Sequence, residues 1–157
     1  MPKVDIAKVP VRSGSFYPAE FQAEHKGRHK QALGDVVGLT QFGVNISRIE
    51  PGASTALRHW HEQEDEFIYV LEGELVLVEN GGETVLKAGD AAGFKAGDRN
   101  GHSFQNRSAA DVVLMEIGTR DPASETFYSD IDMRTFAGKP GYARRDGTPY
   151  PIRPRAS

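Results

Sequence analysis

The sequence predicts an all-β fold, a sandwich or a barrel, for residues 42–118 of the 157-residue chain. Two observations support this prediction. Short apolar runs rich in Val, Ile, Leu and Phe follow one another there, about eight of them at even spacing, and each ends in a turn signal. The 17 glycines and 9 prolines of the chain mostly punctuate such runs, as is typical of antiparallel strands joined by short turns.

The composition is that of a soluble globular domain, and it narrows the range of partners. The chain is 38% hydrophobic and 26% charged, with a formal net charge of -3, so neither nucleic acid nor an anionic membrane is an expected partner. Cysteine is absent, which excludes disulfides, thiolate metal ligands and a cysteine nucleophile. No apolar leader follows the first residues and no run approaches the roughly 20 residues that span a bilayer. We therefore expect a cytoplasmic protein.

Three segments are expected along the chain: an irregular N-terminal arm packed on the barrel (1–41), the barrel itself (42–118) and an extended C-terminal segment (119–157). Aromatic residues are expected to anchor the two flanking segments: Phe16, Tyr17, Phe21, Tyr142 and Tyr150. The pattern His-x-His occurs once, so the sequence predicts a single barrel rather than a duplicated one.

Two histidines of the N-terminal arm suggest a metal pair but are interpreted otherwise. Residues 19–32 could form a short helix, on which His25 and His29 would share a face. Three neighbouring basic residues would repel a cation, and no further ligand lies nearby. Both histidines are therefore predicted to be solvent-exposed surface residues.

The strands are predicted in order from the change in pattern at Phe42. A Pro-Gly pair closes the first strand, and a polar run at 62–65 closes the second. The pair Asn80-Gly81 predicts a two-residue hairpin, because both residue types tolerate positive φ. The predicted strands are 42–49, 55–61, 66–71, 74–79, 83–86, 91–94, 102–106 and 111–117.

Three histidines and one carboxylate within these strands are predicted to share one metal ion. His59 and His61 lie on the same face because side chains alternate along a strand, and they are roughly 7 Å apart. The polar turn at 62–65 resets the alternation, so Glu66 can re-enter beside them, and barrel closure can bring His102 from a distant strand. Such a set leaves one to three coordination positions open. It suits a divalent transition metal, namely Mn, Fe, Ni, Co, Cu or Zn.

The same stretch resembles the first sequence motif of the cupin superfamily. That motif runs glycine, about five residues, His-x-His, three or four residues, Glu, six residues and glycine. Here Gly52 is followed by six residues and then by His59 and His61; Glu66 follows after four more, and Gly73 after a further six. The match is specific because it fixes both histidines, the carboxylate and two turn glycines together.

The second cupin motif is matched more loosely. It runs glycine, five residues, proline, one residue, glycine, two residues, His, three residues and Asn. Gly89 begins the match, Lys95 stands where proline is usual, Gly97 agrees, and four residues rather than two precede His102. Asn106 follows at the expected offset. Together the two motifs cover residues 52–106, and the departures concern the loop at 95–101.

The resemblance implies a double-stranded β-helix, also called a jelly roll or conical barrel, that is often dimeric. It also implies that His59, His61, Glu66 and His102 are the metal ligands. Glu64 and Asp65 lie close to His61 in the sequence, and either is an alternative to Glu66.

Strand alternation also predicts which residues line a pocket beside the metal. Ile68 and Val70 share the face of Glu66, Phe104 shares the face of His102, and Phe94 is a further candidate for substrate binding. Trp60 has the opposite parity and is expected to serve in packing. Asn106 is expected to fix the turn after its strand through side-chain hydrogen bonds.

Two classes of function are consistent with this site. A metalloenzyme would act on a small oxygen-rich molecule, such as a keto or hydroxy acid, a diol or a sugar. It would be a dioxygenase with a redox-active metal, or an isomerase or decarboxylase with the metal as Lewis acid. The base in the latter case would be Glu64, Asp65 or a tyrosine. The alternative is a non-catalytic cupin that binds a small molecule, since a fold does not imply a function.

Overall fold

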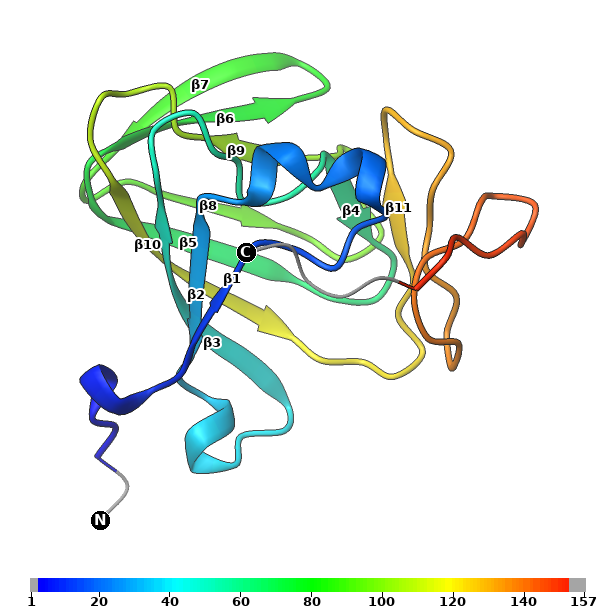
Figure 1. Ribbon diagram of the computed structural model, residues 1–157, viewed down its shortest axis with the longest axis horizontal. Coiled ribbons are helices and arrows are strands. Elements are labelled where there is room, and N and C mark those ends of the chain that lie inside the picture. The colour runs from blue at the N-terminus through cyan, green and yellow to red at the C-terminus, as the bar shows by residue number, and fades with distance from the viewer. Residues whose placement is uncertain (1–2, 153–157) are drawn as a thin grey trace.

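The computed structural model describes residues 3–152 and is built from β-strands (Figure 1). Within those residues the helices are four single 3-10 turns: η1 (Ile6–Lys8), η2 (Ala19–Phe21), η3 (Ala23–His25) and η4 (Asp35–Val37). None of the helices in the described part is long and apolar enough to cross a membrane. The strands are β1 (Val11–Ser13), β2 (Arg28–Ala32), β3 (Phe42–Ile49), β4 (His59–His61), β5 (Glu66–Glu72), β6 (Glu74–Glu79), β7 (Gly82–Lys87), β8 (Ala91–Phe94), β9 (Ser103–Gln105), β10 (Val112–Thr119) and β11 (Thr126–Tyr128).

The strands form two packed layers, as predicted for an all-β sandwich or barrel. A six-stranded antiparallel sheet has the order β1-β2-β3-β10-β5-β8, a three-stranded sheet has the order β7-β6-β9, and β4 pairs with β11. In Figure 1 the β7-β6-β9 layer lies above β10, β5 and β8. One apolar core joins the layers. It contains Ile68 and Leu114 of the larger sheet, together with Leu75 and Phe104 of the smaller one.

Several strand predictions were accurate. The first predicted strand (42–49) and the strand at 91–94 have the observed bounds, and the hairpin at residues 80–81 joins β6 to β7. The second predicted strand (55–61) was too long, because only its last three residues form a ladder. Before them the chain makes single backbone contacts, such as that of Thr55 N with Phe104 O at 2.9 Å.

The prediction of an irregular N-terminal arm was wrong for residues 28–32. These residues form β2, which pairs in register with β3 and extends the large sheet, and β1 pairs with β2 in turn. The helix predicted at 19–32 is therefore absent, apart from the turns η2 and η3. Because Arg28 and Lys30 face a cavity instead of the apolar core, the strand lacks the apolar alternation that would have revealed it.

His25 and His29 were wrongly predicted to be exposed. His25 is 1% exposed, with its Nδ1 lying 3.1 Å from the Ser54 carbonyl oxygen. The imidazole of His29 lies between the Ser13 hydroxyl, at 2.7 Å, and the Glu50 carboxylate, at 2.8 Å. His29 is enclosed because it lies on β2 within the sheet, whereas His25 ends the turn η3 and packs against the ring of Tyr17.

The two flanking segments meet in a second, smaller core. Tyr17, Tyr128 and Met133 are buried there, and Phe21, Tyr142 and Tyr150 pack against them. Four of the five predicted anchors are thus in place. Phe16 is the exception, because 54% of it is exposed. The C-terminal segment also contributes β11, which the sequence analysis did not predict.

Candidate metal centre

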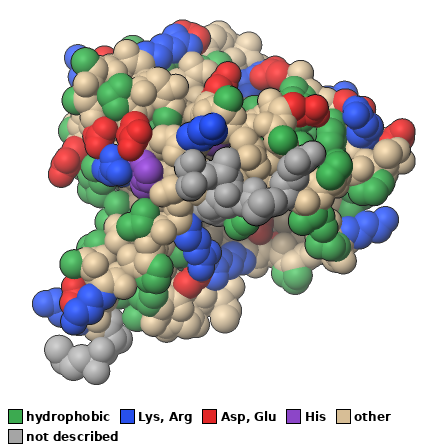
Figure 2. Space-filling view, viewed as in Figure 1, with side chains coloured by type: hydrophobic (Ala, Val, Ile, Leu, Met, Phe, Trp, Pro, Cys, Tyr) green, Lys and Arg blue, Asp and Glu red, His purple; other side chains and the backbone are tan. Residues whose placement is uncertain are grey.

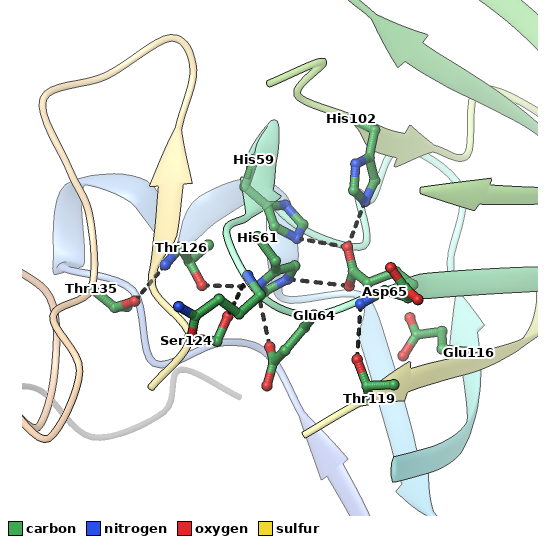
Figure 3. Close-up of polar contacts among 12 residues, drawn as sticks. His59, His61, Glu64, Asp65, His102, Glu116, Thr119, Ser124, Thr126 and Thr135 are labelled. Atoms are coloured by element: carbon green, nitrogen blue, oxygen red, sulfur yellow. Dashed lines mark hydrogen bonds and ion pairs between the residues drawn. The ribbon is translucent and has the colours of Figure 1, made fainter. Parts of the chain in front are cut away.

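The four predicted ligands come together at one end of the space between the sheets. His59 and His61 stand on β4, Glu66 is the first residue of β5, and His102 directly precedes β9. The backbones of His59 and His102 bond each other twice, at 3.1 and 2.9 Å. This pairing brings the distant histidine to the site. Figure 3 shows the three imidazoles pointing toward a common point.

The Glu66 carboxylate lies at the centre of the cluster. Its Oε2 is 2.8 Å from His102 Nε2 and 3.6 Å from His59 Nε2, and its Oε1 is 3.3 Å from His61 Nε2. One donor atom each from His59, His61 and Glu66 lies within 4.8 Å of the other two, which is close enough for a single metal ion. The three-residue set is therefore a candidate metal site, and His102 Nε2 faces the same carboxylate.

Contacts outside the cluster leave the ligand atoms free. His59 Nδ1 lies 2.7 Å from the carbonyl oxygen of Leu57, which as an acceptor requires the proton on Nδ1 and leaves Nε2 with a lone pair. His61 Nδ1 is held by Thr126 Oγ1 at 3.0 Å and by a Glu64 carboxylate oxygen at 3.3 Å. The Nε2 atoms of both histidines are therefore available to a metal.

One buried atom of the cluster shows directly that a cation fits. Glu66 Oε2 is buried and has no hydrogen-bond partner, because His102 Nε2 approaches it at ion-pair distance without hydrogen-bond geometry. An anionic oxygen without a donor is costly in a protein interior. Imidazole nitrogens together with one carboxylate oxygen are ligands that divalent transition metals accept. The residues present therefore fit such an ion.

Electrostatics keep Glu66 and His102 in the protonation states that a metal requires, whereas at His61 burial is outweighed by the carboxylates of Glu66 and Glu64, which raise its pKa. Burial would raise the pKa of Glu66, but the imidazoles of His102, His59 and His61 outweigh burial and hold that pKa well below its ordinary value. Burial lowers the pKa of His102, more than Glu66 raises it. At neutral pH the carboxylate is therefore ionised and this imidazole is neutral, as metal binding demands.

The two alternatives to Glu66 have other partners. Glu64 contacts His61 from outside the cluster and accepts a hydrogen bond from Asp121 N at 2.9 Å. Asp65 accepts one from Ala96 N at 2.8 Å. The turn at 62–65 thus places Glu66 among the imidazoles. Glu64 instead orients His61, and Asp65 fixes the backbone of the neighbouring loop.

A cavity of about 470 Å³ opens from the histidine cluster into the space between the sheets. Ile68, Phe94 and Phe104 line it, and the Phe94 ring stacks on the imidazole of His102 with 3.6 Å between centroids. Val70 does not reach the cavity: it is fully buried in the apolar core. Strand alternation predicted the correct face for Val70. The residue nevertheless lies deeper between the sheets than the cavity extends.

Two supporting residues have the roles expected from the sequence. Trp60 faces away from the cluster and stacks on Phe127, with ring centroids 4.4 Å apart. The Asn106 amide donates to the carbonyl oxygens of Ile49 and Ala110, both at 2.8 Å, and so fixes the turn after β9.

The sequence analysis missed further residues of the cavity, among them Glu116 and Tyr128. Glu116 stands on the inner face of β10, in register with Ile68 of β5. Its signal was available, since it is the single charged residue in the apolar run from Val112 to Ile117. Tyr128 belongs to β11, and its ring lies 5.9 Å from that of His59.

The comparisons with known proteins agree with this fold. A family model described as Cupin domain matches residues 45–118. A sugar phosphate isomerase from a cupin superfamily, from Silicibacter pomeroyi, shares 47% sequence identity with this chain. The match covers 94% of this chain and 96% of that one, with a TM-score of 0.89. The chain belongs to the cupin superfamily.

Other solved structures resemble this cupin less closely. A candidate sugar phosphate isomerase from Acidithiobacillus ferrooxidans is 25% identical, over 90% of this chain and 89% of that one, with a TM-score of 0.77. A polyketide cyclase from Streptomyces resistomycificus is 22% identical, over 77% of this chain and 80% of that one, with a TM-score of 0.64. The latter shows the shared fold alone. No protein with a curated description is detectably similar in sequence.

Proposed function

We propose that this cupin is a metal-dependent isomerase that interconverts an aldose phosphate and a ketose phosphate. The observation that carries the proposal is the 47% identity, over nearly the whole of both chains, to the Silicibacter pomeroyi protein described as a sugar phosphate isomerase. The histidine and carboxylate cluster beside a cavity of about 470 Å³ supports it. The dioxygenase and decarboxylase alternatives have no comparable support.

The reaction needs a polarised carbonyl group and a group that moves a proton. His59, His61 and Glu66 would hold the metal, with His102 as the proposed fourth ligand. When bound, a divalent metal supplies a Lewis acid for the carbonyl oxygen. A proton leaves the carbon next to the carbonyl and is returned to the former carbonyl carbon. The hydroxyl proton passes from the oxygen that becomes the new carbonyl to the oxygen of the old one, so the sugar is isomerised without net oxidation.

Glu116 is the proposed base. It lines the same cavity, and Figure 3 shows it close to the histidine cluster. Burial would raise the pKa of Glu116, but the charges of Lys30, 3.4 Å from its carboxylate, and of Arg28 outweigh burial and lower that pKa. The side chain is therefore a carboxylate at neutral pH and can accept a proton. Glu64 is less suited, because it already contacts His61 and Asp121 N.

The first experiment tests the metal. The purified protein should contain about one divalent ion per chain, and the double variant His59→Ala, His61→Ala should contain none, as measured by inductively coupled plasma mass spectrometry. His29→Ala is the matched control, because it removes a histidine outside the cluster and should leave the metal content unchanged. A wild-type protein that takes up no metal under any loading condition would contradict the proposal.

The second experiment tests the reaction. The metal-loaded protein is incubated in deuterium oxide with a panel of aldose and ketose phosphates, and NMR detects isomerisation and deuterium at carbon. Glu116→Gln should lower the rate by about a hundredfold to ten-thousandfold, the usual contribution of a general base, without loss of metal. A metal-loaded protein that binds sugar phosphates but converts none would instead be the non-catalytic cupin.

A further inference from the structure

A second group of polar side chains lines the same cavity, and it lies on or next to the paired strands β1 and β2. Arg12 of β1 stands opposite Lys30 of β2, and Arg28 lies two residues earlier on the same face of β2. Ser15 follows β1, next to Gly14, whose backbone N–H donates to the Arg28 carbonyl oxygen at 2.9 Å. Neither the arginines nor the serine is among the proposed metal ligands, and only the charge of Arg28 acts on the proposed base.

Two of these groups are buried donors without an acceptor. Ser15 is 5% exposed, and its Oγ has no hydrogen-bond partner among the described residues. Arg28 Nε is likewise buried and unpartnered. Both side chains line the cavity. Because buried polar groups are nearly always hydrogen-bonded, two unpaired donors at the edge of one cavity indicate an acceptor that a ligand supplies.

The charges at this end of the cavity do not cancel. Lys30 pairs with Glu116, and Arg120 pairs with Asp35. Arg12 and Arg28 make no ion pair with any residue in the described part of the chain, and both line the cavity. No carboxylate therefore holds either guanidinium group at contact distance, although the charge of Arg28 also acts on Glu116 and that of Arg12 on Asp35. In the space-filling view, Lys and Arg side chains gather beside β1 and β2 (Figure 2).

We propose that Arg12, Arg28 and Ser15, with Lys30 beside them, bind the phosphate group of the substrate. Guanidinium groups bind phosphate through paired hydrogen bonds, and a hydroxyl group adds a further donor. The identity of the rest of the ligand rests on the proposed isomerase function. The phosphate site itself stands on the unpaired donors and the excess positive charge.

The place of this group in the sheet fits a ligand that is anionic at one end. In the strand order β2-β3-β10-β5 three strand spacings separate β2 from the strand that begins with Glu66, about 14 Å across the sheet. The register also places Lys30 level with Leu114 and Glu66 level with Gly118, four residues or about 13 Å further along the strands. The long side chains of Arg28 and Lys30 reach inward from one side and the metal ligands from the other. An extended sugar with a terminal phosphate would thus place its carbonyl end at the histidine cluster.

The test compares phosphate binding by charge-matched variants of the metal-loaded protein. Isothermal titration calorimetry with inorganic phosphate should show about tenfold weaker binding for Arg12→Gln and for Arg28→Gln, since a charge-assisted contact is lost in each. Ser15→Ala should weaken binding less. The control is Arg107→Gln, which removes the same charge from a surface pair with Glu83 and should change nothing. Circular dichroism confirms that each variant is folded.

Kinetics then separate this proposal from the isomerase function. If the protein isomerises sugar phosphates, both arginine variants should raise KM about tenfold, while binding of the unphosphorylated sugar stays the same. Only Arg12→Gln should leave kcat little changed, because the charge of Arg28 also acts on Glu116. Turnover with unchanged KM would overturn the phosphate site and leave the isomerase standing. No turnover by wild type, with phosphate binding still weakened in both variants, would leave the site standing and overturn the isomerase.

Two further results would overturn the phosphate site. One is an Arg107→Gln variant that weakens phosphate binding as much as the cavity variants do, because the effect would then be one of net charge. The other is equal affinity for pyruvate and for phosphate in the wild-type protein, because the site would then bind carboxylates without selecting phosphate.

Discussion

At the scale of single residues, His25 makes the stability of this cupin depend on pH. The side chain is enclosed by Ser54 and Tyr17, with Arg28 and Glu24 as the nearest charges, and its Nε2 is buried without a partner. Burial lowers the pKa of His25. In mildly acidic solution the imidazole is therefore protonated in the unfolded chain but not in the folded one. The free energy of unfolding should therefore fall as pH drops below the ordinary histidine pKa of 6.5.

A comparison with His25→Asn tests this expectation, because the asparagine amide can still donate to the Ser54 carbonyl oxygen. Urea unfolding is measured at neutral and mildly acidic pH in the presence of a chelator. Each pH unit over which the folded imidazole stays neutral costs the wild type about 1.4 kcal/mol relative to the variant. Contributions from groups other than residue 25 are common to both proteins and cancel in the difference. Parallel pH profiles would show that His25 has no such role.

At the scale of elements, the link between β5 and β6 depends on Gly73. Its φ is +83°, and a Cβ added there would lie 2.9 Å from the Asp111 carbonyl oxygen. Gly73→Ala should therefore lower the free energy of unfolding by about 2–3 kcal/mol, from left-handed strain together with the clash. Gly81→Ala is the matched control: a Cβ there would meet nothing within 4 Å, so urea unfolding should show little change. Equal losses in both variants would contradict this account.

The elements also show what the sequence could and could not predict. β3 was predictable from an apolar run that ends at a Pro-Gly turn, and β8 from the turn signal at 88–90 that precedes it. β2 was missed because its inner side chains face a polar cavity, which apolar periodicity does not register. The candidate metal site of His59, His61 and Glu66 was predictable because strand parity and motif spacing are local. Val70 was misassigned because parity specifies the face of a residue and not how far the cavity reaches along it.

At the scale of the whole molecule, the outer face of the large sheet suggests how two copies would associate. Phe67, Tyr69 and Leu71 alternate along β5 on the face opposite Glu66 and Ile68, and they are 43%, 41% and 37% exposed. Exposed apolar rows of this kind mark interaction surfaces, and a twofold dimer would bury the same row of both subunits. We therefore expect a homodimer formed through the outer face of β5.

The double variant Tyr69→Lys, Leu71→Lys should convert this dimer into monomers. Each subunit would place two positive charges in the interface, where burial and mutual repulsion oppose association. Light scattering after size-exclusion chromatography measures the mass. Val85→Lys is the control, since Val85 is 51% exposed but lies on β7 of the other sheet. A monomeric wild type, or a double variant that stays dimeric, would contradict the assignment. Since side chains alternate between the two faces of β5, the double variant should keep its full metal content, which separates loss of the dimer from unfolding.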